Sequence, residues 1–376
     1  MRVLYALILL LLPSALLAQQ SAVPNPPPIA AKAFVLSDFN SGQPLVAHNA
    51  TQRIEPASLT KLMTAYLTFA ALRQKTLKTD QVIPISTRAW KSEGSRMFIE
   101  PNKPVAVEEL IKGMIVQSGN DACVALAEAI GGTEEVFAQM MTREAQRLGM
   151  KSTHFMNATG LPHPQHYTTA SDLVLLASAL IRDFPEYYPY YSLKEYRYNN
   201  ITQSNRNRLL WVDPTVDGMK TGFTENAGYC LITSARRGQR RLVSVVLGAH
   251  SESTRATESQ KLLNYGFQFY DTARLYEKNQ AVSTVKVWKG SANTLKAGFP
   301  YDLYLSVPKG ASEKLRATVE TKQPLLAPIA AGQKIGVLRV ELDGKPYGEF
   351  PVLALEEVPL AGILGRGWDS LRLLFK

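Results

Sequence analysis

The stretch Glu55-Pro-Ala-Ser-Leu-Thr-Lys-Leu-Met-Thr64 opens a regular helical pattern in this 376-residue chain. Apolar residues recur at helical spacing as far as Leu72, and Pro56 stands just ahead of the expected first turn. Because positions i and i+3 share one helix face, Ser58 and Lys61 are expected one turn apart. A nucleophilic serine needs a nearby base, and a neutral lysine can serve. The free N–H groups of a helix start also favour developing negative charge.

Two further motifs follow this helix, the first in a loop between helices and the second in a strand. Ser118-Gly-Asn120 interrupts a helical region, and Lys220-Thr-Gly222 opens a strand-like run. A second Ser-x-x-Lys pair, Ser283 and Lys286, lies in an alternating segment, where a strand would turn the two side chains to opposite faces. That copy and a second Ser-x-Asn at residues 291–293 both follow Lys220, so only one set of motifs has this order.

The residues around these motifs predict an α+β fold. Two apolar runs that flank Asp38-Phe-Asn-Ser-Gly42 indicate a β-hairpin, and residues 228–235 and 242–249 have the composition of strands. Helical patterns cover residues 134–148, 170–182 and 254–270. Strands at both ends of a helical middle favour an antiparallel sheet with helices on its faces.

The chain changes character after residue 274. Short alternating runs with frequent turn signals predict a small all-β sandwich over residues 275–355. In residues 356–376 the apolar positions recur at three- and four-residue steps: Leu360, Ile363, Leu364, Trp368, Leu371, Leu374 and Phe375. This segment is too polar to span a bilayer, and we expect an amphipathic helix that anchors the protein at a membrane surface. Docking of the same apolar face on the β domain is the alternative.

The N-terminus indicates the compartment of the protein, and the net charge indicates the kind of partner that it binds. Arg2, an apolar run to Leu17 and Ala18 before polar residues are typical of a signal peptide over residues 1–18. The formal net charge of +10 suits an anionic partner. In an exported protein that partner is anionic lipid or wall polymer, so we expect no nucleic acid. A hydrophobic content of 45% and a charged content of 20% exclude a wholly disordered chain and a collagen-like fibre.

The histidines and cysteines do not form a metal motif. His163 and His166 lie in a Pro-rich loop, and we expect neither a metal ion nor a cofactor. Cys123 and Cys230 are too few for a disulfide scaffold, and each is expected to be a buried thiol.

The ordered set of motifs resembles the serine penicillin-recognising enzymes, whose corresponding elements line one cleft. The chain is more closely similar to low-molecular-mass penicillin-binding proteins that act as D-alanyl-D-alanine carboxypeptidases. Three stretches add to residues 55–64: Ser118-Gly-Asn-Asp-Ala-Cys-Val124, Asn205-Arg-Asn-Arg-Leu-Leu-Trp211 and Val216-Asp-Gly-Met-Lys-Thr-Gly222. The resemblance covers almost the whole chain. It implies a serine transpeptidase/β-lactamase-like catalytic domain over residues 19–274, followed by the β sandwich and the C-terminal helix.

The resemblance also implies a serine acyl-enzyme mechanism. Ser58 would attack the carbonyl between two D-alanines of a peptidoglycan stem peptide, and Lys61 would take the serine proton. Lys61 must then spend time neutral, and burial beside Lys220 would lower its pKa. Ser118 would relay the proton to the leaving amine or help to activate the hydrolytic water. β-Lactam antibiotics would trap Ser58 as an acyl adduct.

Substrate-binding roles follow from the same resemblance. Asn120 would hold the substrate amide, and Lys220 and Thr221 would meet the terminal carboxylate. Gly222 would let the strand approach the substrate, and the backbone N–H groups of Ser58 and Phe223 would form the oxyanion hole.

Three positions need separate comment. Phe223 replaces the histidine that some family members carry after Lys-Thr-Gly, which leaves its backbone N–H in place and the deacylation rate open. Arg255 falls where the family has an arginine near the carboxylate site. For Arg206, which precedes the Lys-Thr-Gly motif, we favour a structural or solvated role.

Three rival functions remain at this point. A class A β-lactamase would carry a Glu-x-x-Leu-Asn element, which the chain lacks, and would have no β domain. A D,D-endopeptidase would share the catalytic set, and a catalytically idle wall-binding module would not need the Ser58/Lys61 pair. We expect a periplasmic carboxypeptidase, attached peripherally to the anionic outer leaflet of the inner membrane.

Overall fold

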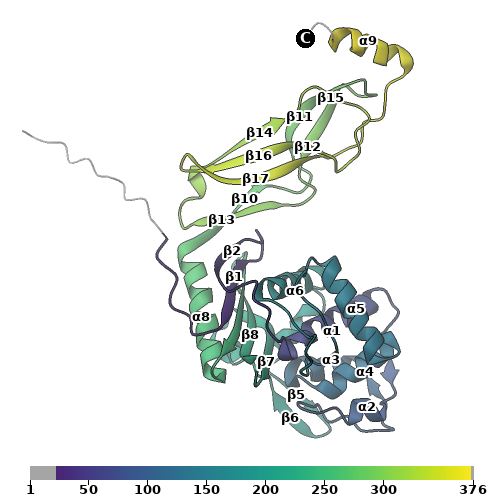
Figure 1. Ribbon diagram of the computed structural model, residues 1–376, viewed down its shortest axis with the longest axis vertical. Helices are drawn as coiled ribbons and strands as arrows, with labels where there is room; N and C mark the ends of the chain where they lie inside the picture. The colour runs from purple at the N-terminus through teal and green to yellow at the C-terminus, as the bar shows by residue number, and fades with distance from the viewer. Residues whose placement is uncertain (1–22, 374–376) are drawn as a thin grey trace, which may run out of the picture.

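The computed structural model describes residues 23–373. The predicted signal peptide at residues 1–18 and the side chains of Leu374 and Phe375 lie outside the described residues. Figure 1 shows a larger body of helices and sheet, an all-β body joined to it, and a helix at the far end of the β body.

A five-stranded antiparallel sheet forms the framework of the larger body, in the order β2-β1-β9-β8-β7. Its strands are β1 (Ala33–Asp38), β2 (Pro44–His48), β7 (Val216–Thr224), β8 (Gly228–Arg237) and β9 (Arg240–Ala249). The predicted hairpin and both predicted strands are thus confirmed. Strand β1 pairs with β9, so segments from the two ends of this body meet in mid-sheet and leave β7 at one edge.

Helices cover both faces of this sheet (Figure 1). The helical layer that carries the first two motifs contains α1 (Lys61–Arg73), α3 (Val107–Lys112), α4 (Asn120–Gly131), α5 (Glu134–Arg147) and α6 (Ala170–Asp183). The long helix α8 (Glu252–Phe269) packs on the opposite face. Apolar side chains of α1, α4 and α6 are fully buried together in one core, as the helical periodicity predicts.

The start of the first helix differs from the prediction. Residues Ala57–Thr60 form a 3₁₀ turn, η1, and the α-helix begins only at Lys61. Ala57 has a φ of 49°, a left-handed conformation that an α-helix does not contain. Ser58 therefore lies in a tight turn against the helix N-terminus.

Several short elements complete the larger body. They are β3 (Val82–Ile83), α2 (Thr87–Trp90), β4 (Val105–Ala106), the π-helical turn η2 (Gly113–Gln117), η3 (Tyr188–Ser192), β5 (Glu195–Tyr198), β6 (Ile201–Ser204) and α7 (Leu209–Val212). The sequence analysis missed the β5–β6 hairpin. Its turn residues Asn199 and Asn200 both have positive φ, a signal for this turn that the sequence contained. Lys220 was expected to open its strand, whereas it lies in the middle of β7.

The all-β body is a sandwich, as predicted. Strands β10 (Tyr270–Tyr276) and β13 (Leu303–Pro308) form one small sheet. The other sheet contains β11 (Ala281–Trp288), β12 (Thr294–Gly298), β14 (Leu315–Thr321), β15 (Leu325–Leu326), β16 (Lys334–Leu342) and β17 (Lys345–Ala354), and a short turn, η4 (Ser312–Lys314), precedes β14. Leu303 and Leu305 of the small sheet share one core with Leu295 and Leu338 of the large sheet.

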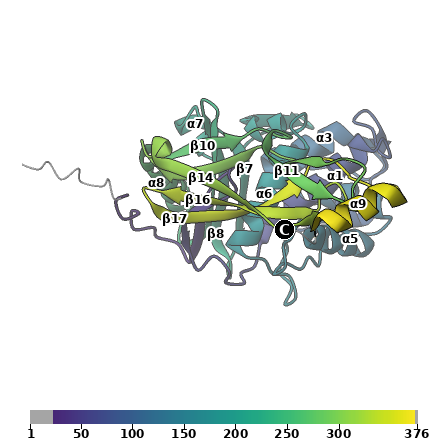
Figure 2. The same cartoon turned by 90° about the horizontal axis from the view of Figure 1, so that it is seen from above.

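The C-terminal helix α9 (Ile363–Leu373) does not pack its apolar face on the sandwich. Ile363 is 80% exposed and Leu364 is 90% exposed, and no residue of α9 is buried. Figure 1 places α9 at the end of the β body remote from the five-stranded sheet, and Figure 2 looks onto that end from above. Within residues 23–373, the structure has no helix with the length and hydropathy that a membrane crossing requires.

Candidate active site

The fold brings Ser58 and Lys61 into hydrogen-bond contact, as the spacing predicts. Ser58 Oγ and Lys61 Nζ are 2.8 Å apart, and Lys61 Nζ also donates to the carbonyl of Thr159 at 2.5 Å. Lys61 is almost completely buried because α1 is covered by neighbouring helices. The amine is thus held in one position, next to the hydroxyl that it would deprotonate.

Burial lowers the pKa of both lysines of the site. The pKa of Lys61 falls to about 8, chiefly through loss of water, and the positive charge of Arg206 also lowers it. Burial lowers the pKa of Lys220 well below its ordinary value, and the charge of Lys61 lowers it further. We expected burial beside Lys220 to lower the pKa of Lys61; burial is indeed the main cause, and the cation that adds to it is Arg206. Within residues 23–373, Lys61 Nζ contacts Ser58 Oγ whereas Lys220 Nζ donates to the carbonyl of Thr221, so Lys61 is the candidate base.

Ser118 and Asn120 line the same cavity as Ser58. Ser118 ends the π-helical turn with a left-handed backbone, φ 65° and ψ 34°, which is rare for serine and occurs at functional sites. Asn120 Nδ2 donates to the carbonyl of Glu93 at 2.6 Å. Asn120 Oδ1 is buried and has no hydrogen-bond partner among the described residues, so it is free to accept a hydrogen bond from a substrate amide.

A loop at residues 93–99 forms one side of the cavity, and the sequence analysis missed it. The carboxylate of Asp121, which follows Asn120 directly, accepts hydrogen bonds from the backbone N–H groups of Met97 and Phe98, both at 2.9 Å, and of Ile99 at 3.2 Å. Asp121 is fully buried. Asp121 therefore fixes the position of the loop that faces Asn120.

The edge strand β7 forms the opposite side, with Thr221, Gly222 and Phe223 lining the cavity. A Cβ atom on Gly222 would lie 3.2 Å from Ala57 Cβ, so the absence of a side chain lets β7 pack against the turn that carries Ser58. This contact was not predicted, and the predicted approach of Gly222 to substrate stays a prediction. The Phe223 ring is half exposed and lies 4.4 Å from the Tyr229 ring.

Both arginines reach the cavity. The buried Arg255 donates to the carbonyl of Gly222 at 3.3 Å and pairs with Glu252 at 3.3 Å. Arg206 is exposed, lines the cavity and makes no ion pair with any described carboxylate. The structure therefore places Arg206, for which we favoured a structural or solvated role, where it could meet a bound anion.

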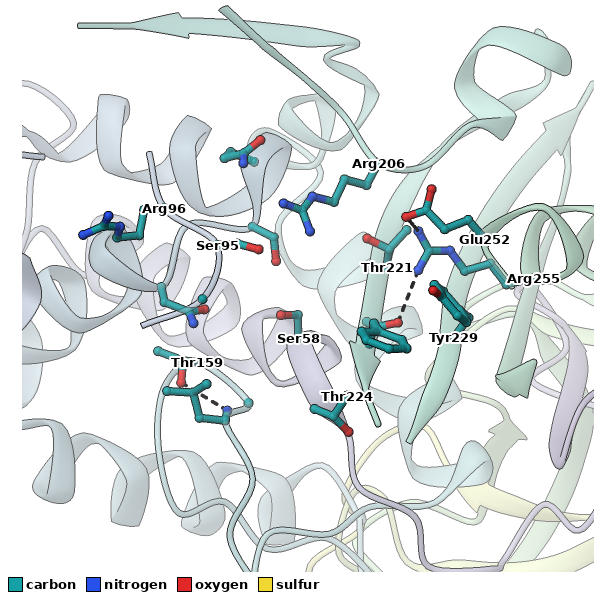
Figure 3. Close-up of a pocket in the computed structure, with 18 of the residues that line it drawn as sticks. Ser58, Ser95, Arg96, Thr159, Arg206, Thr221, Thr224, Tyr229, Glu252 and Arg255 are labelled. Atoms are coloured by element: carbon teal, nitrogen blue, oxygen red, sulfur yellow. Dashed lines mark hydrogen bonds and ion pairs between the residues drawn. The ribbon is translucent and has the colours of Figure 1, made fainter. Parts of the chain in front are cut away.

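The cavity has a volume of about 520 Å³, in the range of small-ligand sites. Figure 3 shows Ser58 between the side with Arg206, Thr221 and Glu252 and the side with Thr159 and Thr224. Arg206 and Arg255 concentrate positive charge at the first of these sides. The arrangement is that of a serine acyl-transfer site with an anion-binding end.

Gly160 packs against the turn that carries Ser58, and its replacement is a testable prediction. Its φ is 88°, and an added Cβ would lie 1.8 Å from Ala57 O and 3.0 Å from Ser58 N. We expect Gly160→Ala to displace Ser58 and to slow acylation by labelled penicillin by about tenfold or more. Gly238→Ala is the matched control, because Gly238 also has positive φ, 61°, but no atom lies within 4 Å of its added Cβ. Equal acylation rates in both variants would contradict this role.

The remaining candidates do not line the cavity. Cys123 and Cys230 are free and buried, as predicted. His166 is buried, and its Nε2 lies 3.0 Å from Thr60 Oγ1. Ser283 and Lys286 lie in strand β11, as expected for the second Ser-x-x-Lys copy.

Comparison with known proteins agrees with this site. Residues 19–251 match the D-alanyl-D-alanine carboxypeptidase family, and residues 270–360 match the penicillin-binding protein 5 C-terminal domain. The D-alanyl-D-alanine carboxypeptidase DacC of Escherichia coli is 39% identical over 98% of this chain and 94% of its own length.

Solved structures give the same result. The chain is similar to penicillin-binding protein 5 from Haemophilus influenzae, with a TM-score of 0.86 and 40% identity over 89% of this chain and 99% of that chain. Penicillin-binding protein D2 from Listeria monocytogenes, solved in an ampicillin-bound form, is 32% identical, with a TM-score of 0.60 over 65% of this chain and 99% of that chain. On these grounds the chain belongs to the D-alanyl-D-alanine carboxypeptidase family.

Proposed function

We propose that this protein removes the terminal D-alanine from peptidoglycan stem peptides through an acyl-enzyme on Ser58. The observation that carries the proposal is the 2.8 Å contact between Ser58 Oγ and the buried Lys61 Nζ, in a cavity with a cationic end. The relatives named as D-alanyl-D-alanine carboxypeptidases support the same reaction.

Acylation begins with transfer of the Ser58 proton to neutral Lys61. The oxygen attacks the carbonyl between the two D-alanines, and the amide C–N bond breaks. Backbone N–H groups of Ser58 and Phe223 stabilise the oxyanion. The position of β7 at the edge of the sheet supports this oxyanion hole, because alternate N–H groups of an edge strand have no partner within the sheet. Ser118 passes the proton to the leaving D-alanine amine, and water later hydrolyses the ester.

The terminal carboxylate binds at the cationic end of the cavity. Thr221, Arg206 and Arg255 supply hydrogen bonds or positive charge there. Lys220, whose pKa burial lowers, becomes easier to protonate when the anionic carboxylate binds nearby. A positive Lys220 in turn opposes protonation of Lys61. Substrate binding and activation of the base therefore support each other.

The reaction can be tested with a diacetyl-L-lysyl-D-alanyl-D-alanine peptide. Release of one D-alanine per peptide is the expected result. Absence of D-alanine release, with the protein folded and bound to peptidoglycan, would favour an idle wall-binding module. β-Lactams that mimic the D-alanyl-D-alanine amide should inhibit release by acylating Ser58.

We also propose that the protein is exported to the periplasm and that α9 lies at the outer surface of the inner membrane. The exposed apolar residues Ile363, Leu364, Trp368 and Leu371 support an interfacial position. The exposed Arg372, whose guanidinium lies over the Trp368 ring, flanks that face and suits an anionic lipid surface. The surface partner of the chain in this proposal is anionic phospholipid.

Truncation after Ala361 tests the anchor. The cut keeps the pairing of the buried Val358 with Ile329 and the hydrogen bond from Ala361 N–H to the carbonyl of Lys289, and it removes one hydrogen bond, from Lys289 N–H to Asp369. The truncated protein should leave the membrane fraction and retain penicillin binding. Leu364→Ser in the full chain should weaken partition into anionic vesicles by about tenfold. A truncated protein that stays on the membrane would place the anchor elsewhere, and an insoluble one would make α9 part of the fold.

A further inference from the structure

Glu55, three residues before Ser58, binds the end of the hairpin that β7 and β8 form. One carboxylate oxygen accepts a hydrogen bond from Thr224 Oγ1 at 2.9 Å, and the other accepts one from Asn226 Nδ2 at 3.1 Å. Within residues 23–373, no other side-chain hydrogen bond joins residues 55–60 to residues 224–228. Glu55 itself is partly buried and lies outside the lining of the cavity.

The two donors of the hairpin end require an acceptor at position 55. Thr224 Oγ1 already accepts the N–H of Ala227 at 3.0 Å, and its own proton points to Glu55, because a carboxylate can only accept. Asn226 Nδ2 can only donate. Hydrogen bonds to an ionised acceptor are also stronger than those between neutral groups. A glutamate is therefore chemically matched to both donors.

A second contact joins the same two segments on the other side of Phe223. An added Cβ on Gly222 would lie 3.2 Å from Ala57 Cβ, so β7 packs closely against the turn there. Figure 3 shows Thr224 below Ser58, on the strand that passes the nucleophile. Positions 222 and 224 thus both touch the segment that carries Ser58, and Phe223 lies between them.

The contact at Thr224 determines how the edge strand lies against this turn. Strand β7 is the last strand of its sheet, so it has a partner strand on one side only. With the contact at Gly222 alone, the hairpin end could rotate about that point and carry the N–H of Phe223 with it. Arg255 donates to the carbonyl of Gly222 at 3.3 Å and so strengthens only that first point. The second contact, through Glu55, prevents the rotation.

We propose that Glu55 is a positioning residue for the oxyanion hole, because it fixes the separation of the backbone N–H groups of Ser58 and Phe223. In the proposed function, on which this inference rests, these two groups stabilise the oxyanion that forms during acylation. Such donors are effective only when they already point to the place where the charge develops. Glu55 lies outside the cavity and acts through Thr224.

Glu55→Ala should slow acylation of the full-length protein by labelled penicillin. We expect the first-order rate constant of acylation to fall by about tenfold. The dissociation constant of the non-covalent penicillin complex should change by less than about twofold, because the oxyanion exists only in the transition state and the intermediate. Glu55→Gln keeps one acceptor oxygen, so its rate constant should lie between those of the wild type and Glu55→Ala. In both variants Ser58 should still be labelled completely at the end of the reaction.

Two further variants test whether the hydrogen bond itself is responsible. Glu225→Ala is the matched control, because Glu225 is an exposed acidic residue next to Thr224 and, in the described chain, no hydrogen bond or ion pair joins it to residues 55–60. It should be acylated at the wild-type rate. Thr224→Val removes the other partner of the bond. The double variant with Glu55→Ala should be slowed by no more than about twofold beyond the slower single variant.

The outcomes separate this inference from the proposed function. Wild-type acylation by Glu55→Ala, or fully additive losses in the double variant, would overturn the positioning role and leave Ser58 as the nucleophile. An equal loss in penicillin affinity, or incomplete labelling of Ser58, would indicate general disruption of the site and would also overturn this role. Absence of an adduct in the folded wild type would overturn the proposed function and this inference with it.

Discussion

Replacement of Ser58 by alanine is expected to abolish the covalent penicillin adduct and D-alanine release. Ser58 Oγ is the hydroxyl in contact with Lys61 Nζ, and no other serine of the described chain has a recorded contact with that amine. Loss of an attacking atom removes the acyl-enzyme route, which costs on the order of a thousandfold or more in rate. Labelled penicillin followed by denaturing electrophoresis measures the adduct directly.

The second Ser-x-x-Lys motif supplies a matched control for this experiment. Ser283→Ala removes the same atom from the same sequence pattern, but on strand β11 of the sandwich. It should form the adduct at the wild-type level. The loss of one hydrogen bond in Ser58→Ala should change the free energy of unfolding by only about 1 kcal/mol. Full adduct formation by a folded Ser58→Ala protein would refute both the nucleophile and the proposed function.

Replacement of Lys61 should nearly stop acylation, because the variant cannot accept the serine proton. We expect Lys61→Ala to lower the second-order rate of acylation by at least a hundredfold. Lys61→Met, which keeps most of the buried volume, separates this effect from a cavity in the core. Lys286→Ala, in the second motif, is the control that should acylate normally. Lys220→Ala should both slow acylation and weaken recognition of the substrate carboxylate.

The pH dependence of acylation checks the same role. With the pKa of Lys61 lowered to about 8, the ammonium form dominates below that pH and cannot act as a base. The acylation rate should therefore rise as the pH increases and level off above about 8. A catalytic acid would give the opposite dependence, with an acylation rate that falls as the pH increases. A rate that falls between pH 6 and pH 8, or wild-type acylation by Lys61→Met, would exclude Lys61 as the base.

Local patterns were enough to predict the main elements of the fold. The spacing of apolar residues indicates which face of an element is buried. This spacing predicted the helix that follows Ser58, the N-terminal hairpin, strands β8 and β9, and the sandwich. The three-residue spacing of Ser58 and Lys61 also predicted their contact, because residues at i and i+3 lie close together within one helical turn. These features depend on residues close in sequence.

The cavity walls depended on contacts that no local pattern encodes. Thr159, which binds Lys61 Nζ, is 98 residues away in sequence, and Asp121 holds a loop more than 20 residues upstream. The same reason explains why the position of Arg206 beside the cavity and the packing of Gly222 against Ala57 were not predicted. Both features require knowledge of which strand packs against the turn that carries Ser58.

The sequence by itself determined the Ser58–Lys61 pair, the order of the motifs and the apolar face of the C-terminal helix. Each is a relation between residues within a few turns or strands, where backbone geometry alone fixes the direction of the side chains. Only the tertiary structure decided the lowered pKa of Lys61, the free acceptor on Asn120 and the contact of Glu55 with Thr224. Burial and long-range contacts arise when distant segments pack together, so they exist only in the folded chain.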